Sequence, residues 1–284
     1  MAAFRKIWWA DFTAAEFDKI DPMRTIAILP TAAIEQHGPH LPVGVDTFLN
    51  RGPLDAMAKR VPASLDVRIL PVQTIGKSNE HIWQKGTISS TAHTLIDMWF
   101  EIGQSVSRAG IKKLVIINSH GGNVSIIDIV ARELRVRESM LVVKTSWSAF
   151  APPAGLVSDM EQRQGIHAGD VETSQMLHFQ PDLVDMRAAE DFRSVAARDE
   201  QQFKYLRPTG PHAYGWIASD LNPSGAVGNA ANATAERGQA ISEAQIAGML
   251  ELLTEVEAAP LPDPSGLTLG NRFAFASFGL RGGG

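Results

Sequence analysis

Four potential metal ligands lie close together in a stretch that follows an apolar run at residues 25–30. The stretch reads E-Q-H-G-P-H-L-P-V-G-V-D and contains Glu35, His37, His40 and Asp46. Carboxylate oxygens combined with imidazole nitrogens suit Zn, Mn or Fe better than Ca or Mg. A single carboxylate can bridge two ions about 4 Å apart. We therefore predict a metal site here, with His40 either a ligand or a residue that orients one. The alternative is a polar surface loop stiffened by its prolines.

The motif N-S-H-G-G-N at residues 118–123 directly follows another apolar run. Ligands of open α/β proteins bind at the carboxyl edge of the sheet, so we expect His120 at the same edge as the first cluster. Gly121 and Gly122 would let the backbone approach a ligand closely. The alternative is a phosphate cradle at a helix N-terminus, although the segment has neither G-x-G-x-x-G nor the lysine of a P-loop.

The motif H-A-G-D-V-E-T-S begins at His167 and combines a histidine with two carboxylates. Asp170 or Glu172 could complete a metal site, and His167 could carry a proton. An ordinary capped helix start is the competing interpretation.

A fourth segment, residues 76–89, follows a further predicted strand and should reach the same edge. Ser78, Glu80 or His81 could contact a substrate there, and a solvated loop is the alternative. His93 and His178 lie in helix-like stretches, so we expect them to be structural.

The elements that would position these motifs alternate along the chain. Apolar, β-branched runs predict strands at residues 25–29, 67–72, 114–117 and 141–145. Helical spacing predicts helices at 46–60, at 92–108, from near Asn123 to 138, and at about 234–257, with the Asn123 side chain as a cap. This alternation predicts βαβ units and a parallel sheet.

Prolines and glycines interrupt the pattern between residues 181 and 238, which predicts a long loop or insertion. We expect one domain over residues 1–270 and a mobile tail over residues 271–284.

The composition excludes several classes of protein. A net charge of −5 and a pI near 5.9 offer no basic surface for nucleic acid. The chain has no cysteine, so any metal must bind to nitrogen and oxygen. No apolar run approaches the roughly 18 residues of a membrane span, and the first residues lack the apolar core of a signal peptide. We expect a cytoplasmic enzyme without a membrane or nucleic-acid partner.

Taken together, the motifs resemble the creatininase (creatinine amidohydrolase) family. The matching segments run in order from about residue 25 to 240: E-Q-H-G-P-H-L-P-x-x-x-D, N-S-H-G-G-N, H-A-G-D-V-E-T-S and S-D-L-N-P-S-G-A-V-G-N-A-x-x-A-T-A-E-R-G. The resemblance implies a single three-layer α/β domain with a mostly parallel central sheet flanked by helices. It also implies two divalent metal ions per chain, a small amide-like substrate cleaved at a non-peptide or cyclic C–N bond, and a homo-oligomer, commonly a hexamer.

Residue by residue, the resemblance implies the metal ligands Glu35, His37, Asp46 and His120, with Asp46 as the bridging carboxylate. Creatinine-cleaving members carry a fifth, carboxylate ligand where this chain has Gly122. We therefore expect Glu172 as the fifth ligand, with Asp170 as the alternative.

The resemblance to the creatininase family also has implications for the substrate. Gly121 stands where creatinine-cleaving members carry a substrate-contacting tyrosine, so we expect a substrate other than creatinine. His167 matches a substrate-contacting histidine, and Trp147 matches a pocket tryptophan. Lys77, Lys85 and Arg163 lie near the expected site and permit an anionic or hydroxylated substrate.

We thus expect an amidohydrolase in which a metal-activated bridging water attacks the substrate. His167 and Glu172 are the expected catalytic residues. The expected substrate contacts are Ser78, Glu80, His81, Gly121, Trp147 and His167. The family also contains deformylases of pyrimidine ribotides, a peptidase that matures a redox-cofactor peptide and a hydrolase of a cyclic polyol ketone. A non-catalytic phosphate- or nucleotide-binding protein also remains possible.

Overall fold

A four-stranded parallel sheet forms the centre of the computed structural model, which describes residues 5–262. Its strand order is β2-β1-β3-β4, with β2 at Val67–Ile69, β1 at Ile26–Thr31, β3 at Lys113–Asn118 and β4 at Leu141–Ser146. Every residue of β1 and β3 is buried, as expected of central strands covered on both faces. The predicted parallel sheet is confirmed. The tail predicted at residues 271–284 lies outside the described residues.

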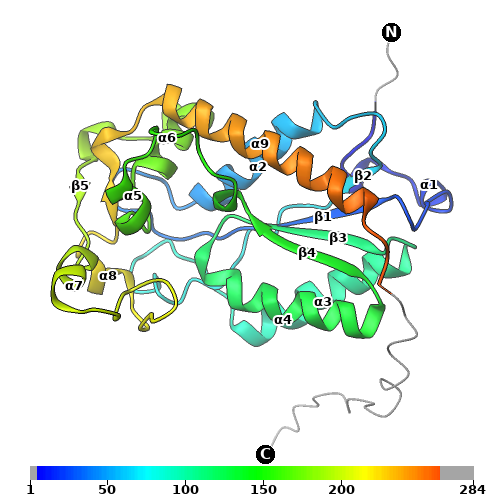
Figure 1. The fold of residues 1–284 in the computed structure, drawn as a ribbon, viewed down its shortest axis with the longest axis horizontal. Helices are drawn as coiled ribbons and strands as arrows, with labels where there is room; N and C mark the ends of the chain where they lie inside the picture. The colour runs from blue at the N-terminus through cyan, green and yellow to red at the C-terminus, as the bar shows by residue number, and fades with distance from the viewer. Residues whose placement is uncertain (1–4, 263–284) are drawn as a thin grey trace, which may run out of the picture.

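Helices cover both faces of this sheet (Figure 1). On one face lie α2 (Val45–Ala58) and α9 (Ala235–Ala258), and on the other lie α3 (Ala92–Arg108) and α4 (Val124–Glu138). Successive strand residues point to opposite faces. Thus Ile28 packs in the core cluster of α2 and α9, whereas Leu29 packs in that of α3 and α4. The result is the predicted three-layer sandwich.

Short elements occupy the rest of the chain. They are η1 (Trp9–Asp11), α1 (Ala14–Phe17), η2 (Gly121–Asn123), η3 (Trp147–Ala149), α5 (Asp159–Gln164), α6 (Asp170–Phe179), η4 (Pro181–Leu183), η5 (Met186–Ala188), β5 (Asp191–Phe192), α7 (Ala196–Gln202), α8 (Ala218–Leu221), β6 (Gly228–Asn229) and η6 (Ala230–Asn232). Strands β5 and β6 form a small antiparallel pair. No helix within residues 5–262 is long and apolar enough to cross a membrane.

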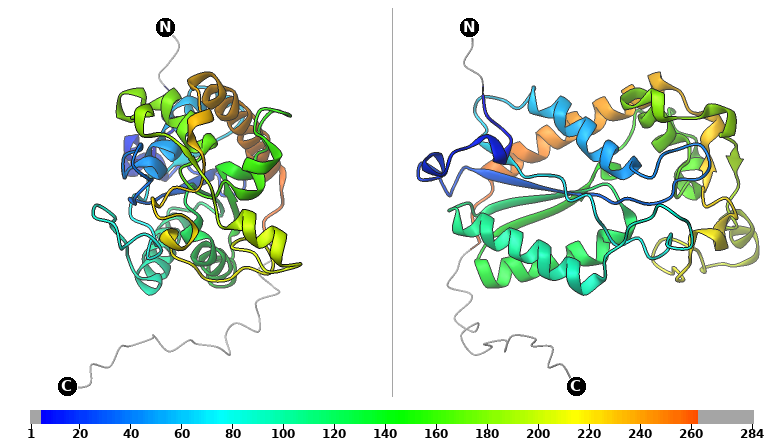
Figure 2. Two further views of the ribbon diagram at one scale, coloured as in Figure 1. Left: turned by 90° about the vertical axis from the view of Figure 1, so that its left-hand side faces the viewer. Right: turned by 180° about the vertical axis from the view of Figure 1, so that it is seen from behind.

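The carboxyl ends of β1, β3 and β4 meet at one edge of the sheet, far from α1, and α5 to α8 gather beyond that edge (Figures 1 and 2). The segments that follow these strands carry the motifs predicted to bind metal.

Asn123 does not cap α4, contrary to the sequence prediction. Its side chain oxygen accepts a hydrogen bond from the amide of Lys77 at 3.0 Å, and its side chain nitrogen donates to the carbonyl of Ala32 at 3.0 Å. Because η2 precedes α4, Asn123 already has helical backbone angles, which a capping residue lacks. Its side chain instead ties together the segments after β1, β2 and β3.

Candidate metal centre

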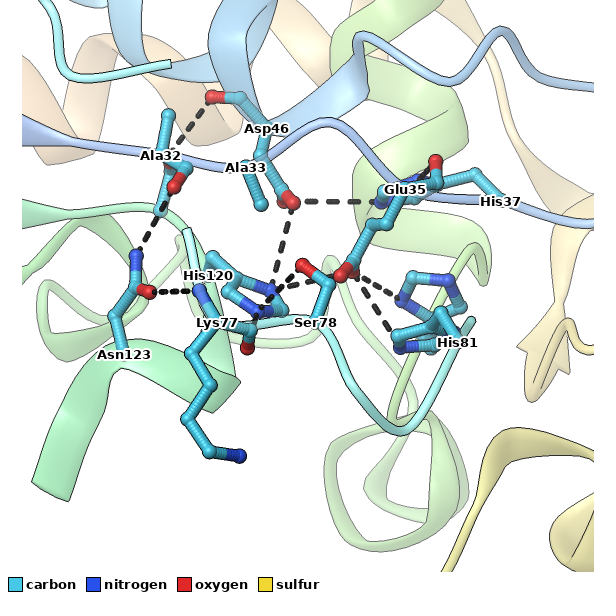
Figure 3. A network of polar contacts seen from close by, with 12 residues as sticks. Ala32, Ala33, Glu35, His37, Asp46, Lys77, Ser78, His81, His120 and Asn123 are labelled. Carbon is cyan, nitrogen blue, oxygen red and sulfur yellow. Dashed lines mark hydrogen bonds and ion pairs between the residues drawn. The ribbon is translucent and has the colours of Figure 1, made fainter. Parts of the chain in front are cut away.

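Buried carboxylates and histidines from distant parts of the chain converge at this edge. In three groups, the potential ligand atoms all lie within 4.8 Å of one another: Glu35, Asp46 and His120; His37, Asp46 and Glu172; Glu35, His37 and His167. Asp46, in the first turn of α2, belongs to the first two groups. Figure 3 shows the side chains of Glu35, Asp46 and His120 pointing toward one another.

A backbone carbonyl fixes the orientation of His37. Its Nδ1 donates to the carbonyl oxygen of Glu35 at 3.0 Å. In the neutral ring Nε2 is then an acceptor, and it faces Asp46 Oδ1 at 3.7 Å and Glu172 Oε2 at 3.8 Å. When the ring is neutral, two kinds of acceptor therefore face one another in a buried site.

His120 and His167 repeat this arrangement. His120 Nε2 donates to the carbonyl of Lys77 at 2.8 Å, which turns Nδ1 toward Glu35 Oε1 at 3.2 Å and Asp46 Oδ2 at 3.5 Å. His167 Nε2 donates to the carbonyl of Gln36 at 2.7 Å, and its Nδ1 lies 3.7 Å from Glu35 Oε1. Backbone carbonyls commonly orient metal-binding histidines in this way.

Several of these buried atoms have no hydrogen-bond partner. Glu35 Oε2, His37 Nε2 and Asp46 Oδ2 are all buried and unpaired within the described part of the chain. Buried polar atoms are rarely left unpaired. Bound divalent cations would satisfy these atoms, and this set of nitrogen and oxygen donors fits Zn or Mn.

The carboxylates also shift the pKa values of the ring nitrogens. Burial alone would lower the pKa of His37, but Asp46 outweighs it and raises this pKa to about 9. Against the same effect of burial, Glu35 raises the pKa of His120 to about 10. Burial, and then the charge of Glu35, raises the pKa of Asp46 to about 6. The cluster thus attracts positive charge.

His81 presents a proton instead of a lone pair to the cluster. The side chain of Gln36 accepts from the amide of Gly38 at 2.9 Å and donates to the carbonyl of Gly225 at 3.1 Å, which fixes its amide orientation. Its nitrogen therefore donates to His81 Nδ1 at 2.7 Å. His81 then carries its proton on Nε2, 3.5 Å from Glu35 Oε1. Burial, and then nearby His167, lowers the pKa of His81 to about 3, which keeps the ring neutral.

Ser78, Glu80 and His81 lie behind the cluster, although we expected them to contact substrate. Ser78 is fully buried, with its hydroxyl 3.3 Å from His120 Nε2, and Glu80 Oε1 lies 3.7 Å from the same nitrogen. None of the three lines the cavity described below. The hydrogen bonds that close the turn after β2 bring these side chains against His120.

Gly122 has no room for a side chain. A Cβ there would overlap the carbonyl oxygen of Lys77, the carboxylate of Glu80 and the ring of His120. A carboxylate ligand at this position is therefore excluded by packing.

Glu172 and Asp170, both in the first turn of α6, have different surroundings. Glu172 faces His37 and also accepts from the amide of Ala168 at 2.6 Å, where Ala168 has a left-handed φ of 55°. Asp170 points elsewhere: it pairs with Arg237 and accepts from Ser174 at 3.0 Å. Only Glu172 lies near the other potential ligands.

His40 lies beside the cluster and belongs to none of the three ligand groups. Its Nε2 hydrogen-bonds the hydroxyl of Thr173 at 2.9 Å, and its ring stacks on Phe192. This position fits the alternative of a supporting residue.

A cavity of about 590 Å³ adjoins the cluster. Its lining includes the cluster residues His120, His167 and Glu172, and we call this side the floor of the cavity. Gly121 and Trp147, two expected substrate contacts, also line it. Trp147 is only 4% exposed and donates its indole N–H to Asn50 at 3.3 Å. Its N–H is therefore not free to bind a substrate, which can meet only a small part of the indole surface.

Glu161 in α5 is a functional candidate that the sequence motifs did not predict. Its carboxylate accepts from the amides of Asp170 at 2.8 Å and Asn229 at 2.9 Å. A Cβ at Gly165, Gly169 or Gly228 would overlap this carboxyl group. Glu161 therefore joins α5, β6 and the segment around His167, and burial raises its pKa. Only the nearby glycines could have hinted at it.

The fold and this cluster define an α/β protein with a candidate metal centre at the carboxyl edge of its sheet. The sequence model of the creatininase family, described as creatinine amidohydrolase, matches residues 10–253. The chain belongs to the creatininase family of hydrolases.

Two curated relatives align over most of their length. The mycofactocin precursor peptide peptidase of Mycobacterium ulcerans is 30% identical over 84% of this chain and 87% of its own. The creatinine amidohydrolase of Pseudomonas putida is 29% identical over 81% of this chain and 89% of its own.

Solved creatininases share the fold. A manganese form aligns with a TM-score of 0.69 and 24% identity, over 88% of this chain and 98% of its own. A creatininase variant of a Zn–Zn type aligns with the same TM-score and identity, over 89% of this chain and 98% of its own.

Proposed function

We propose that this chain is an amidohydrolase that holds two divalent ions, Zn or Mn, at the cluster. Asp46 belongs to two ligand groups, one with Glu35 and His120 and one with His37 and Glu172. The observation that carries the proposal is that its two oxygens face different histidines, Oδ1 toward His37 and Oδ2 toward His120. Such sharing is the role of a bridging carboxylate. Glu35 also belongs to two groups, but it faces His120 and His167 through Oε1 alone. Glu172 replaces the side chain that Gly122 cannot provide.

Bound in pairs, such ions lower the pKa of a water molecule toward about 7 and polarise a carbonyl group. The protein supplies the orientation of the ligands, through the carbonyls of Glu35 and Lys77. His81 presents its Nε2–H toward Glu35 Oε1 at 3.5 Å.

His167 is suited to proton transfer. The carbonyl of Gln36 holds its Nε2–H, so its unprotonated Nδ1 faces the cluster at the floor of the cavity. Burial, and then the charge of His37, lowers its pKa to about 4, so the ring is neutral at rest and would hold a proton only transiently during the reaction. Nδ1 could then return that proton to the departing nitrogen.

The scissile bond is a C–N amide bond, and the proposed substrate is not creatinine because Gly121 leaves the cavity open beside His120. The principal proposal is a non-peptide or cyclic amide. Cleavage of a peptide bond is the second candidate, supported by the similarity to a precursor peptide peptidase. The expected hexamer and cytoplasmic location stay predictions.

The test is to remove metal by chelation, restore Mn or Zn, and assay creatinine, hydantoin, N-formyl amines, lactams and short peptide amides. We expect metal-dependent hydrolysis of an amide other than creatinine. Hydrolysis that persists fully in the chelated protein, or no hydrolysis across the panel with restored metal, would contradict the proposal.

A further inference from the structure

The cavity above the cluster is lined by few charged side chains. Among the described residues that line it there is no lysine or arginine. Its only carboxylates are Glu161, whose oxygens accept backbone hydrogen bonds, and Glu172 at the floor. With His120 neutral and bound to metal, an anionic group in this cavity would lose its hydration and find no lysine or arginine on the walls to pair with.

The nearby cations are engaged elsewhere. Lys77 lies 3.9 Å from Glu80, and Arg163 lies 3.8 Å from Glu200. Lys85 does not line the cavity either. The sequence had suggested that these three residues permit an anionic substrate, but the structure places none of them on the cavity wall.

Much of the wall is apolar. The apolar side chains lining the cavity include Leu49, Val124, Phe150, Val157, Val171 and Ile241. Apart from the two carboxylates and the two histidines, the remaining wall is polar and uncharged. Much of it is already paired: Gln175 donates to Ser242 and Gln245, and the Ser119 hydroxyl donates to the carbonyl of Asp46. Ser146 and Ser148 hydrogen-bond to each other, which leaves one hydroxyl hydrogen free for a neutral polar group.

Gly121 and Gly122 divide the space around His120. A Cβ at Gly122 would overlap its neighbours, whereas a Cβ at Gly121 would meet nothing within 4 Å. The open space at Gly121 belongs to the cavity. Gly121 therefore determines how large a group can lie beside the cluster.

We propose that the site takes an uncharged amide whose acyl part carries an apolar group about the size of a leucine side chain, accommodated beside Gly121. The inference rests on the proposed hydrolase function, because the amide must reach the metal centre. It excludes phosphorylated and carboxylated substrates from the cavity.

Three hydroxamates test this without knowledge of the natural substrate, because each binds a metal centre through the same head group. The probes are acetohydroxamate, 4-methylpentanohydroxamate and succinic monohydroxamate, of which the last two have tails of nearly equal shape. Their affinities for the manganese-loaded protein are measured by calorimetry. The apolar tail should bind about tenfold tighter than the carboxylate tail and than acetohydroxamate, because it buries its methyl groups without desolvating a charge.

The variant Gly121→Tyr should reduce the preference for the apolar tail over acetohydroxamate at least threefold. Gly215→Tyr is the matched control, since Gly215 is exposed, lies outside the cavity lining and also has open space around its Cβ. It should leave the preference unchanged.

Equal or tighter binding of succinic monohydroxamate would overturn the substrate class while leaving the metal centre intact. An unchanged preference in Gly121→Tyr would overturn the role of Gly121. If the protein binds no manganese, or if no hydroxamate binds the loaded protein, the proposed function itself fails and the substrate class falls with it.

Discussion

His37 Nε2 lies 3.7 Å from Asp46 Oδ1, while the other nitrogen of the ring is held by the carbonyl of Glu35. When the ring is neutral, as metal binding requires, two acceptors face each other in a site where neither can reach water. His120 has the same relationship to the second oxygen of Asp46, at 3.5 Å. A cation on each side of Asp46 resolves both contacts, which explains why we propose two ions and not one.

Replacing Glu172 with glutamine should remove one ion of the pair, because an amide oxygen is a weaker ligand than a carboxylate. Metal content should fall from about two to about one per chain, as measured by elemental analysis. Stability should change little, since Glu172 is partly exposed.

Asp170→Asn is the matched comparison, two residues away in α6. This change leaves Arg237 without its buried partner and should lower the free energy of unfolding by roughly 3 kcal/mol. Metal content should stay at two. If Asp170→Asn lost one ion and Glu172→Gln lost none, Asp170 would be the fifth metal ligand in place of Glu172.

This choice between Glu172 and Asp170 shows the limit of prediction from sequence. Two positions apart on a helix, the residues point in different directions. Which of them faces the cluster depends on the packing of α6 against α9, and that contact joins segments distant in sequence. The same holds for His81, whose proton position depends on Gln36 and Gly225.

The features that could be predicted are local. The helix predicted at residues 92–108 occurs with those bounds as α3, because a clear apolar periodicity and the Thr91 cap define it. Glu35, His37 and Asp46 follow β1 within one segment, and His120 follows β3. Because adjacent parallel strands end at the same edge, sequence alone could bring these residues together.

His167→Asn should retain two ions per chain but lower kcat about 10²- to 10⁴-fold, because the proton carrier is lost. Steady-state kinetics and elemental analysis together check this. The control His212→Asn changes an exposed histidine and should alter neither quantity. Full turnover in His167→Asn would refute the catalytic role, and loss of an ion would make His167 a ligand.

Glu161→Gln should weaken the junction between α5, β6 and the segment around His167. An amide can accept only one of the two backbone hydrogen bonds well, so the free energy of unfolding should fall by about 1–3 kcal/mol. Displacement of His167 should also lower kcat more than it changes KM. In the same helix, exposed Asp159→Asn should change stability by less than about 0.5 kcal/mol. Wild-type stability and kcat in Glu161→Gln would contradict this role.

Metal affinity should rise with pH. The raised pKa values of His37 and His120, about 9 and 10, mean that both rings hold protons at neutral pH without metal. Metal must displace these protons, so affinity should increase between pH 6 and 8 by about tenfold per pH unit for each proton released. The increase should become shallower above pH 9 and level off above pH 10. Calorimetry in buffers of different ionisation enthalpy measures the metal affinity and the number of protons released. A metal affinity that stays flat or falls as the pH rises would exclude proton displacement.

The most direct test of the binuclear centre is the metal content of Asp46→Asn. This variant keeps the shape of the side chain but removes the charge shared by both ligand groups. Asp55→Asn, an exposed change in the same helix, serves as the control. After reconstitution with Mn or Zn, wild type and Asp55→Asn should each bind two ions per chain, whereas Asp46→Asn should bind fewer than one. Two ions retained in Asp46→Asn, or none in the wild type, would contradict the account.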